Sequence, residues 1–341
     1  MNSLTLQFLR GVGSPFAGSD HEVFTEDLSR LYHHALKNRM ALLYLDFLKK
    51  LDKLGSLRKE HDKLIGEYAR AEKVIYRISK MLDRASIDYT FFKSIRPYRE
   101  STADFDILVF GSKYEEVIRA MASAGYKFLG YGPLSTTFRD EEARIDLDIY
   151  DEVGVSRIIY LDKDMLTKFI GYRTLSNGEV VRSLIPEADL LAVIGHSVVK
   201  EQMYVLSEYY TTLYYLADMK WEALNSFLSL IDKCRMHLAV KAHLGITALL
   251  HHGAHSSIPV VLLQLLKKLG LDRLELVRVE EMGFNLPYKY HPVTVIKALI
   301  EKFGEEKARR SFVFQALNML NPSFTSSVVK KTIHHFFRET Y

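Results

Sequence analysis

The sequence predicts an α+β protein: a small mixed sheet between N-terminal helices and a C-terminal all-helical domain. Apolar residues recur at helical spacing up to about Arg84. Short alternating runs with turn signals then fill residues 86–185, and beyond Pro186 the pattern is helical again. We therefore expect three parts, over residues 1–85, 86–185 and 186–341.

The first part begins with a segment rich in Gly and Ser, so residues 1–20 are expected to be an irregular lead-in. Two amphipathic helices should follow. In the first helix, around Ala41–Leu48, the apolar residues lie on one broad face. The second and longer helix, Leu57–Ala85, has the same pattern. Both helices are expected to pack on the next domain.

At Ser86, where the middle part begins, the helical spacing of apolar residues gives way to short runs typical of strands. Asn177-Gly178 lies between two such runs and is a strong hairpin signal, because both residues tolerate positive φ. Gly125 closes the one amphipathic helix of this part. The expected strands are 87–92, 104–110, 126–131, 136–139, 143–150, 172–176 and 179–185, and the expected helix is 113–124.

The last part begins with Pro186, suited to the first position of a helix, and has acidic residues in that first turn. The Tyr-rich run Tyr209–Tyr215 has the spacing of a buried helix face, and core packing is favoured over base stacking. The expected helices are 186–204, 207–219, 221–233, 238–250, 259–269, 292–303, 305–320 and 326–339.

Composition limits the class of protein. The chain has 341 residues, 48% hydrophobic, which is enough for two or three domains with a sizeable core. Its single cysteine, Cys234, excludes an internal disulfide framework. The N-terminus lacks the features of a signal peptide, and no apolar run approaches the roughly 18 residues of a membrane span. A soluble, cytoplasmic protein without a membrane partner is expected.

Charge is unevenly distributed along the chain. The net charge is +4 over residues 1–84, −3 over 85–184 and +3 over 185–341. An acidic middle part between two basic parts is compatible with a carboxylate-lined metal site flanked by surfaces that tolerate polyphosphate or nucleic acid. Ordinary variation of surface charge explains the same distribution equally well.

The most informative motif is Asp104-Phe105-Asp106, at the start of an apolar run. Strand side chains alternate, so the two carboxylates share one face and Phe105 takes the other. Two neighbouring buried carboxylates are costly unless a cation neutralises them. A divalent cation at a strand end does this, and metal-assisted phosphoryl or nucleotidyl transfer uses such an arrangement.

A second acidic pair follows on a later strand. Asp146 and Asp148 alternate with apolar residues and share one face. An Asp-x-Asp pair with a third Asp on a neighbouring strand can hold two Mg²⁺ or Mn²⁺ ions against a nucleoside triphosphate. Acidic residues on solvent-facing edge strands are the alternative interpretation.

The order of these motifs resembles the polymerase-β-type nucleotidyltransferase superfamily, in particular an uncharacterised branch with a minimal acidic pattern. The resemblance runs from about residue 35 to 218 and implies a nucleotidyltransferase-like middle domain. It is carried, in order, by Phe91-Phe-Lys-Ser94, Arg96, Arg99, Asp104–Val109, Ala124-Gly-Tyr126, Ile145-Asp-Leu-Asp148 and Ile185-Pro-Glu187 through His196.

The resemblance implies roles for the acidic residues. Asp104 and Asp106 would be catalytic metal ligands. Asp146 matches the third acid, and Asp148 on the same face is the alternative ligand. The metal would be Mg²⁺ or Mn²⁺, and the nucleoside triphosphate is expected to be ATP.

Basic and small residues would contact the nucleotide. Lys93-Ser94 takes the place of a Gly-containing element that lets backbone approach the triphosphate, and the glycine is missing here. Arg96 and Arg99 are natural phosphate partners, and His196 lies in the helix after the sheet, either facing the cleft or packing beneath it.

The favoured function is transfer of a nucleoside monophosphate from a nucleoside triphosphate to a hydroxyl. The acceptor, whether nucleic acid, protein or a small molecule, is left open, as is the oligomeric state. The missing glycine favours an alternative, a catalytically decayed nucleotidyltransferase fold that binds nucleic acid or protein. A second alternative is a nucleic-acid-binding helical protein whose middle domain is only a platform.

Overall fold

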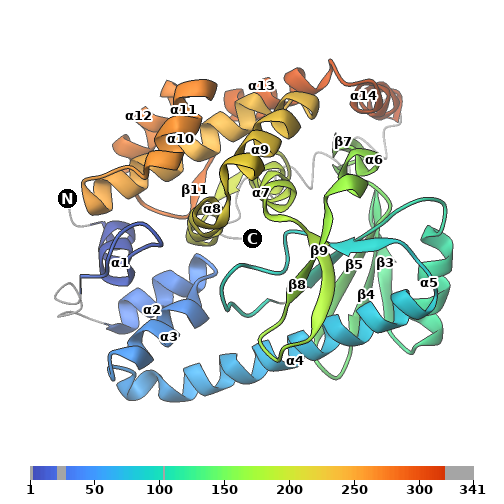
Figure 1. Ribbon diagram of the computed structural model, residues 1–341, viewed down its shortest axis with the longest axis horizontal. Helices are drawn as coiled ribbons and strands as arrows, with labels where there is room; N and C mark the ends of the chain where they lie inside the picture. Colours follow the sequence, from blue (N-terminus) through green and yellow to red (C-terminus); the bar gives the residue numbers. More distant parts are fainter. Residues whose placement is uncertain (1–2, 21–27, 103, 319–341) are drawn as a thin grey trace. The chain divides into compact units, whose positions relative to one another are not determined.

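The structure is a computed structural model that describes residues 3–20, 28–102 and 104–318. The helix expected over 326–339 lies outside the described residues. Within them the chain combines helices with a seven-stranded mixed sheet, so the predicted α+β class is confirmed (Figure 1).

Contacts along the chain divide it into two compact units. One, here called the sheet unit, comprises residues 42–192; the other, the helical unit, comprises 1–41 and 193–341. These boundaries do not coincide with the predicted ones at 85 and 185. The long helix α4 (Arg58–Arg84) packs directly on the sheet, which explains why it belongs to the sheet unit.

The sheet has the strand order β3-β4-β5-β2-β1-β9-β8. β2 and β5 run parallel, as do β1 and β9, and the other neighbouring pairs are antiparallel. The Asn177-Gly178 hairpin is confirmed: it joins β8 to β9, with Gly178 at φ +85°. The strands are β1 (Tyr89–Phe91), β2 (Asp104–Val109), β3 (Lys127–Tyr131), β4 (Ser135–Asp140), β5 (Ile145–Tyr150), β8 (Ile170–Thr174) and β9 (Val180–Leu184).

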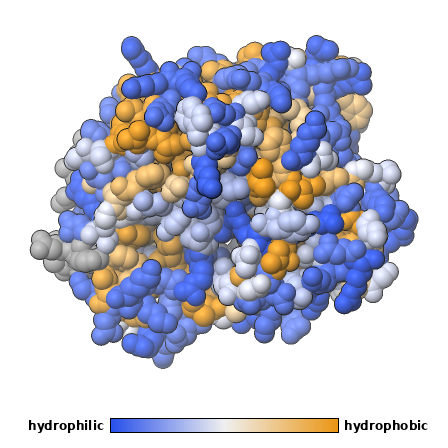
Figure 2. Space-filling model, in the orientation of Figure 1, coloured by the Kyte–Doolittle hydropathy of each residue, from blue (hydrophilic) through white to orange (hydrophobic). Residues whose placement is uncertain are grey.

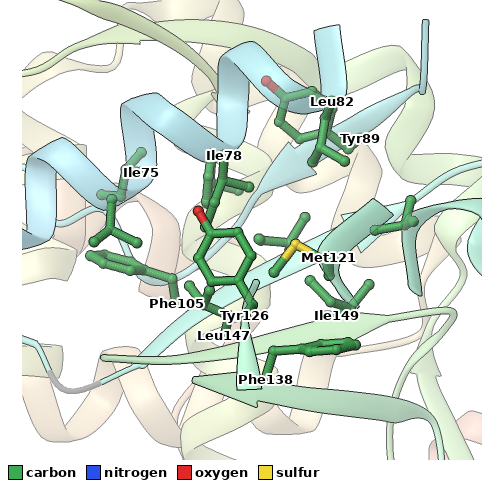
Figure 3. Packing of buried hydrophobic residues seen from close by; sticks show 14 of the residues in the cluster. Ile75, Ile78, Leu82, Tyr89, Phe105, Met121, Tyr126, Phe138, Leu147 and Ile149 are labelled. Atoms are coloured by element: carbon green, nitrogen blue, oxygen red, sulfur yellow. The ribbon is translucent and has the colours of Figure 1, made fainter. Parts of the chain in front are cut away.

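Two helices cover one face of this sheet and bury its core (Figure 3). Ile75 and Ile78 of α4 and Met121 of α5 (Tyr114–Ser123) pack against apolar side chains of the central strands. The strand residues in this core are Tyr89, Phe91, Phe105, Ile107, Val109, Phe138, Ile145, Leu147, Ile149 and Val181. Alternation therefore leaves the acidic residues of β2 and β5 on the opposite face.

Smaller elements complete the sheet unit. A helix, α3 (Ala41–Lys50), and a short 3₁₀ turn precede α4. After β5, a small hairpin and two short helical turns that no local pattern predicted lead into β8. They are β6 (Val153–Val155), β7 (Ile158–Leu161), α6 (Lys163–Leu166) and η3 (Thr167–Phe169), and the 3₁₀ turn before α4 is η2 (Gly55–Leu57).

The helical unit is organised around α10 (His237–His255), which packs against several other helices of the unit. Twelve of its 19 residues are buried, as expected for a central helix. The other elements are α1 (Leu4–Val12), α2 (Leu28–Lys37), η4 (His196–Lys200), β10 (Met203–Tyr204), α8 (Leu206–Asp218), α9 (Trp221–Lys233), α11 (Val260–Leu269), α12 (Arg273–Glu281), β11 (Tyr288–Lys289), α13 (Pro292–Lys302) and α14 (Glu306–Asn318).

The helical unit differs from expectation in three places. Residues 1–20 are not wholly irregular, because Leu6, Phe8 and Leu9 give α1 a buried apolar face. The helix expected over 186–204 ends earlier: α7 (Pro186–Gly195) passes into a π-helical turn, η4, and then into β10. β10 pairs with β11, so this part is not all-helical.

Three of the four tyrosines of α8 are core residues, as the spacing predicted, and Tyr214 is only partly buried. Tyr209, Tyr210 and Tyr215 are each at most 1% exposed. They are therefore closed to a stacking base. None of the described helices is long and apolar enough to cross a lipid bilayer.

Leu147 tests the sheet core. It is fully buried in β5, so Leu147→Ala should lower the free energy of unfolding by about 2–5 kcal/mol through lost burial and a residual cavity. Tyr172→Ala on β8 is the control, because that ring is 74% exposed, and it should cost less than about 1 kcal/mol. Chemical denaturation measures both, and equal losses would contradict this core.

Candidate active site

The acidic residues of β2 and β5 lie side by side. The parallel register aligns Asp104 with Asp146 and Asp106 with Asp148. Aligned residues of neighbouring strands point to the same face of a sheet, so all four carboxylates share the face opposite α4 and α5. We call these four residues the carboxylate face. The two acidic pairs singled out in the sequence are thus brought together.

Asp106 is the most buried member of the carboxylate face, with 3% exposure. The Lys93 ammonium lies 2.5 Å from its Oδ2, and the Ser94 hydroxyl donates to the same oxygen at 2.9 Å. The Ser94 oxygen also accepts a hydrogen bond from the Asp106 backbone N–H at 2.8 Å. A buried carboxylate is therefore neutralised by a cation of the same chain.

Lys93 reaches Asp106 from a tight turn after β1. The Ser94 N–H donates to the Phe92 carbonyl at 2.7 Å, and Lys93 between them has φ +51°. This left-handed conformation favours glycine and costs a residue with a side chain about 1–2 kcal/mol. The turn therefore has the backbone shape that the absent glycine would suit, and Lys93 adopts it.

Two further contacts hold this turn. The Lys93 N–H donates to Oδ1 of Asp189 at 2.5 Å, and Asp189 is almost fully buried in the first turn of α7. The Lys93 ammonium also lies 5.4 Å from the ring centroid of Phe92 and 5.8 Å from that of Tyr150, within cation–π range. The surrounding protein thus compensates the strained backbone.

Asp146 and Asp148 are bonded to side chains of β4. Arg139 lies opposite Asp146 and forms a two-pronged ion pair with it, Nε to Oδ1 at 2.5 Å and Nη2 to Oδ2 at 2.9 Å. Thr137 lies opposite Asp148 and donates its hydroxyl to Oδ1 at 2.5 Å. The one neighbouring strand β4 therefore supplies a partner to each acid.

Asp104 has a weaker partner. The Thr102 hydroxyl lies 3.1 Å from its Oδ1 and 2.8 Å from its backbone carbonyl. Among the residues that the structure describes, no lysine or arginine forms an ion pair with Asp104. Asp104 is therefore the member of the carboxylate face that is most available to a ligand.

The negative charge of the carboxylate face affects the hydroxyl of the nearby Tyr150. It lies at the end of β5 and is only 4% exposed. Burial, followed by the nearby Asp106 and Asp148 carboxylates, raises the pKa of the Tyr150 hydroxyl well above its usual value. The Tyr150 hydroxyl therefore stays protonated at neutral pH.

The other predicted contact residues lie differently. The guanidinium of Arg99 pairs with Asp46 of α3 at 2.8 Å. Arg96 is half-buried and lines a small cavity together with Ser94. His196 belongs to the helical unit, where its Nε2 lies 3.5 Å from a carboxylate oxygen of Glu201.

Sequence reasoning did not find the partners of the carboxylate face. Thr137 and Arg139 alternate with Phe138, so the pattern of β4 could have placed them on a polar face, but it could not reveal pairing with β5. Asp189 was assigned only to the first turn of a helix. Its contact with Lys93 joins residues 96 positions apart, which no local pattern shows.

The predicted metal ligands do not form a ready-made metal site among the described residues, and binding of Mg²⁺ or Mn²⁺ stays a prediction. Carboxylate oxygens are the right donors for Mg²⁺. Among residues 3–20, 28–102 and 104–318, however, no three Asp, Glu, His or Cys side chains converge to hold a metal ion. Lys93 and Arg139 already neutralise two of the four carboxylates. Two of the four acids of the carboxylate face are thus paired with cations of the chain itself.

Comparisons with known proteins add little. No protein-family model and no curated protein sequence matches the chain. Among solved structures, the chain is similar to the lincomycin-bound crystal structure of the lincosamide antibiotic adenylyltransferase LnuA, with a TM-score of 0.27 and 18% identity over 35% of this chain and 84% of that chain. At this TM-score the similarity carries no argument about the fold or function of this chain.

Glu100 fixes the loop that precedes β2. Its carboxylate accepts backbone N–H groups of Leu42 and Leu43 in the first turn of α3, at 3.3 and 3.5 Å, and that of Ser101 at 3.2 Å. Burial raises the pKa of Glu100 to about 8, and the three N–H groups oppose this rise. The carboxyl thus ties α3 to the segment that leads to Asp104.

Stability should depend on pH through Glu100. Its carboxyl has a raised folded pKa, so the folded state retains a proton that the unfolded state loses. Stability should therefore fall by a few kcal/mol as pH rises from about 4.5 to about 8. Glu100→Gln should remove most of this slope, whereas Glu116→Gln at an exposed position should leave it unchanged. Unfolding curves across this pH range measure it, and an unchanged slope in Glu100→Gln would refute the assignment.

The Lys93–Asp106 ion pair should contribute to the free energy of unfolding. Lys93→Met should lower the free energy of unfolding by about 3–5 kcal/mol, because it leaves a buried carboxylate without its cation. The loss should shrink at low pH, where protonation removes the charge. Lys93→Met/Asp106→Leu should recover most of the stability. Denaturation of the full double-mutant cycle measures the coupling, and additive losses would show that the pair does not interact.

Proposed function

We propose that the carboxylate face is the nucleotide site of a nucleotidyltransferase, which transfers a nucleoside monophosphate from a nucleoside triphosphate to a hydroxyl. The observation that carries the proposal is the parallel register of β2 and β5, which aligns Asp104 with Asp146 and Asp106 with Asp148. The order of motifs along the sequence, and the Lys93-Ser94 turn beside Asp106, support the same function.

The residues of the carboxylate face could take different roles in the transfer. In the transfer, the acceptor oxygen bonds to the α-phosphorus, the bond to pyrophosphate breaks, and the hydroxyl proton must leave. Asp104 would take this proton, because it has no cationic partner among the described residues. Lys93 and Arg139 carry the positive charge of the face, against which phosphate oxygens could be held.

ATP as the donor, and Mg²⁺ or Mn²⁺ as the accompanying ion, remain parts of the proposal. Four carboxylates and two cationic side chains give the face a formal charge of −2, which repels a triphosphate. Additional positive charge, or displacement of Lys93 and Arg139 from their carboxylates, is therefore required for nucleotide to bind. No step is assigned to a metal, because no three ligand side chains converge among the described residues.

A second candidate is a nucleotidyltransferase-like protein that binds without turnover. The Lys93–Asp106 and Arg139–Asp146 pairs favour it, because each acid is already neutralised within the chain. A buried pair such as Lys93–Asp106 is separated only at a cost of several kcal/mol. This candidate predicts binding of a partner, and no release of pyrophosphate from a nucleoside triphosphate.

Nucleotide binding tests the site itself. Titration calorimetry with ATP should show Mg²⁺-dependent binding to the native chain. In the presence of Mg²⁺ the affinity should be at least tenfold weaker, about 1.4 kcal/mol, for Asp104→Asn/Asp106→Asn, because these substitutions remove carboxylates that would hold the accompanying ion. Asp88→Asn is the matched control: Asp88 is 78% exposed and its described ion pair is with Arg182 rather than with the carboxylate face. Equal affinities in all three proteins, or no binding to any, would refute the assigned site.

Turnover separates the two candidates. Pyrophosphate release should be measured with ATP and a mixture of nucleic acid, protein and small alcohols as hydroxyl acceptors. Release that is lost in Asp104→Asn but kept in Asp88→Asn would support the transferase. ATP binding without release would support the second candidate.

A further inference from the structure

The helical unit contains an apolar pocket with no assigned role. It has a volume of about 580 Å³, within the range of sites for small organic ligands. α10, α11 and α12 line it, and α10 packs against both of the other helices. Figure 2 shows apolar surface gathered over this part of the helical unit, towards the upper left of the view.

The walls of the pocket are aliphatic. Leu266 of α11 is buried, whereas Leu263 and Leu271 are 40% and 50% exposed and extend the apolar surface to the rim. Gly245 and Ala248 of α10 contribute little or no side chain, which leaves the floor open. Exposed apolar surface is unfavourable in water in proportion to its area, so an apolar ligand would gain by covering it.

Positive charge accompanies this apolar lining. Lys267 and Arg273 lie on either side of the α11–α12 connection, and His252 lines the pocket from α10. The lining includes no aspartate or glutamate. Within the described part of the chain, neither Lys267 nor Arg273 forms an ion pair.

The nearest acidic residues of α12 are engaged elsewhere. The Asp272 carboxylate caps this helix by accepting the Leu274 N–H at 3.1 Å. Glu275 is fully buried, where it accepts the hydroxyl of Tyr288 and the backbone N–H of His291. Among the described residues, neither carboxylate forms an ion pair with Lys267 or Arg273.

We propose that this pocket binds a small anionic amphiphile, with its aliphatic body against the leucines and its carboxylate on Lys267 and Arg273. The apolar walls select a hydrocarbon body, and the basic rim without acids selects a negative head group. The lining has no aromatic side chain other than His252, so it offers little on which a nucleotide base could stack. This proposal is independent of the function proposed for the carboxylate face.

The test compares ligands that differ only in head group. Titration calorimetry of the full chain with dodecanoate, dodecanol and dodecyltrimethylammonium, all below micelle-forming concentrations, should show the tightest binding for dodecanoate. Lys267→Met/Arg273→Met should weaken dodecanoate binding at least tenfold, about 1.4 kcal/mol, since it removes both charged partners of the carboxylate. Both side chains are exposed, so the double variant should stay folded.

Lys268→Met is the matched control. Lys268 neighbours Lys267 on α11, but its ammonium lies over the Trp221 ring, 5.0 Å from the centroid, and it does not line the pocket. Dodecanoate should bind this variant as it binds the native chain, and dodecanol affinity should be alike in all proteins. Three outcomes would overturn the proposal. They are equal dodecanoate affinity in the native chain and the double variant, binding of the alkyl cation as tight as that of dodecanoate, and no binding of dodecanoate.

Discussion

In the sheet unit β2 lies parallel to β5, and the arrangement of the candidate site follows from this one pairing. Parallel alignment places Asp104 beside Asp146 and Asp106 beside Asp148. The apolar residues between them must then enter the core under α4 and α5. A shift of the register by one residue would bury the carboxylates and expose that core, so packing of the core fixes the position of the acids.

Four like charges on one face require compensation, and the chain supplies part of it. Lys93 neutralises Asp106 and Arg139 neutralises Asp146. For Lys93 this needs a left-handed backbone, which the buried Asp189 stabilises through the Lys93 N–H. The turn after β1, the first turn of α7 and the middle of β2 are thus coupled, and Asp104 remains as the least compensated acid.

Much of this unit could be predicted from sequence because its signals are local. Alternation in Asp104–Val109 and Ile145–Tyr150 predicted two strands with acids on one face, and Asn177-Gly178 predicted a hairpin. The parallel sense of β2 and β5 was not predictable, because alternation is the same in either direction. Nor were the contacts around these acids, because Arg139 reaches Asp146 only through the pairing of β4 with β5, and Asp189 reaches the Lys93 N–H only through the fold.

In the helical unit, too, local patterns predicted helices but not how they pack. Helical spacing predicted the buried tyrosines of α8, but not the π-helical turn at His196–Lys200 or the pairing of β10 with β11. The pocket between α10, α11 and α12 arises from helices whose individual patterns are ordinary. Only their packing brings Gly245 and Ala248 opposite the leucines of the neighbouring helices.

The central claim is that the carboxylate face is a nucleotide site whose acids are held by cations of the chain itself. A crystal structure soaked with a non-hydrolysable nucleoside triphosphate analogue and Mn²⁺ tests it most directly. The account predicts triphosphate density beside Asp104 and the Lys93-Ser94 turn, with the Lys93 ammonium displaced from Asp106 wherever anomalous density for Mn²⁺ appears. Nucleotide bound elsewhere in the chain, with all four carboxylates unchanged, would contradict it.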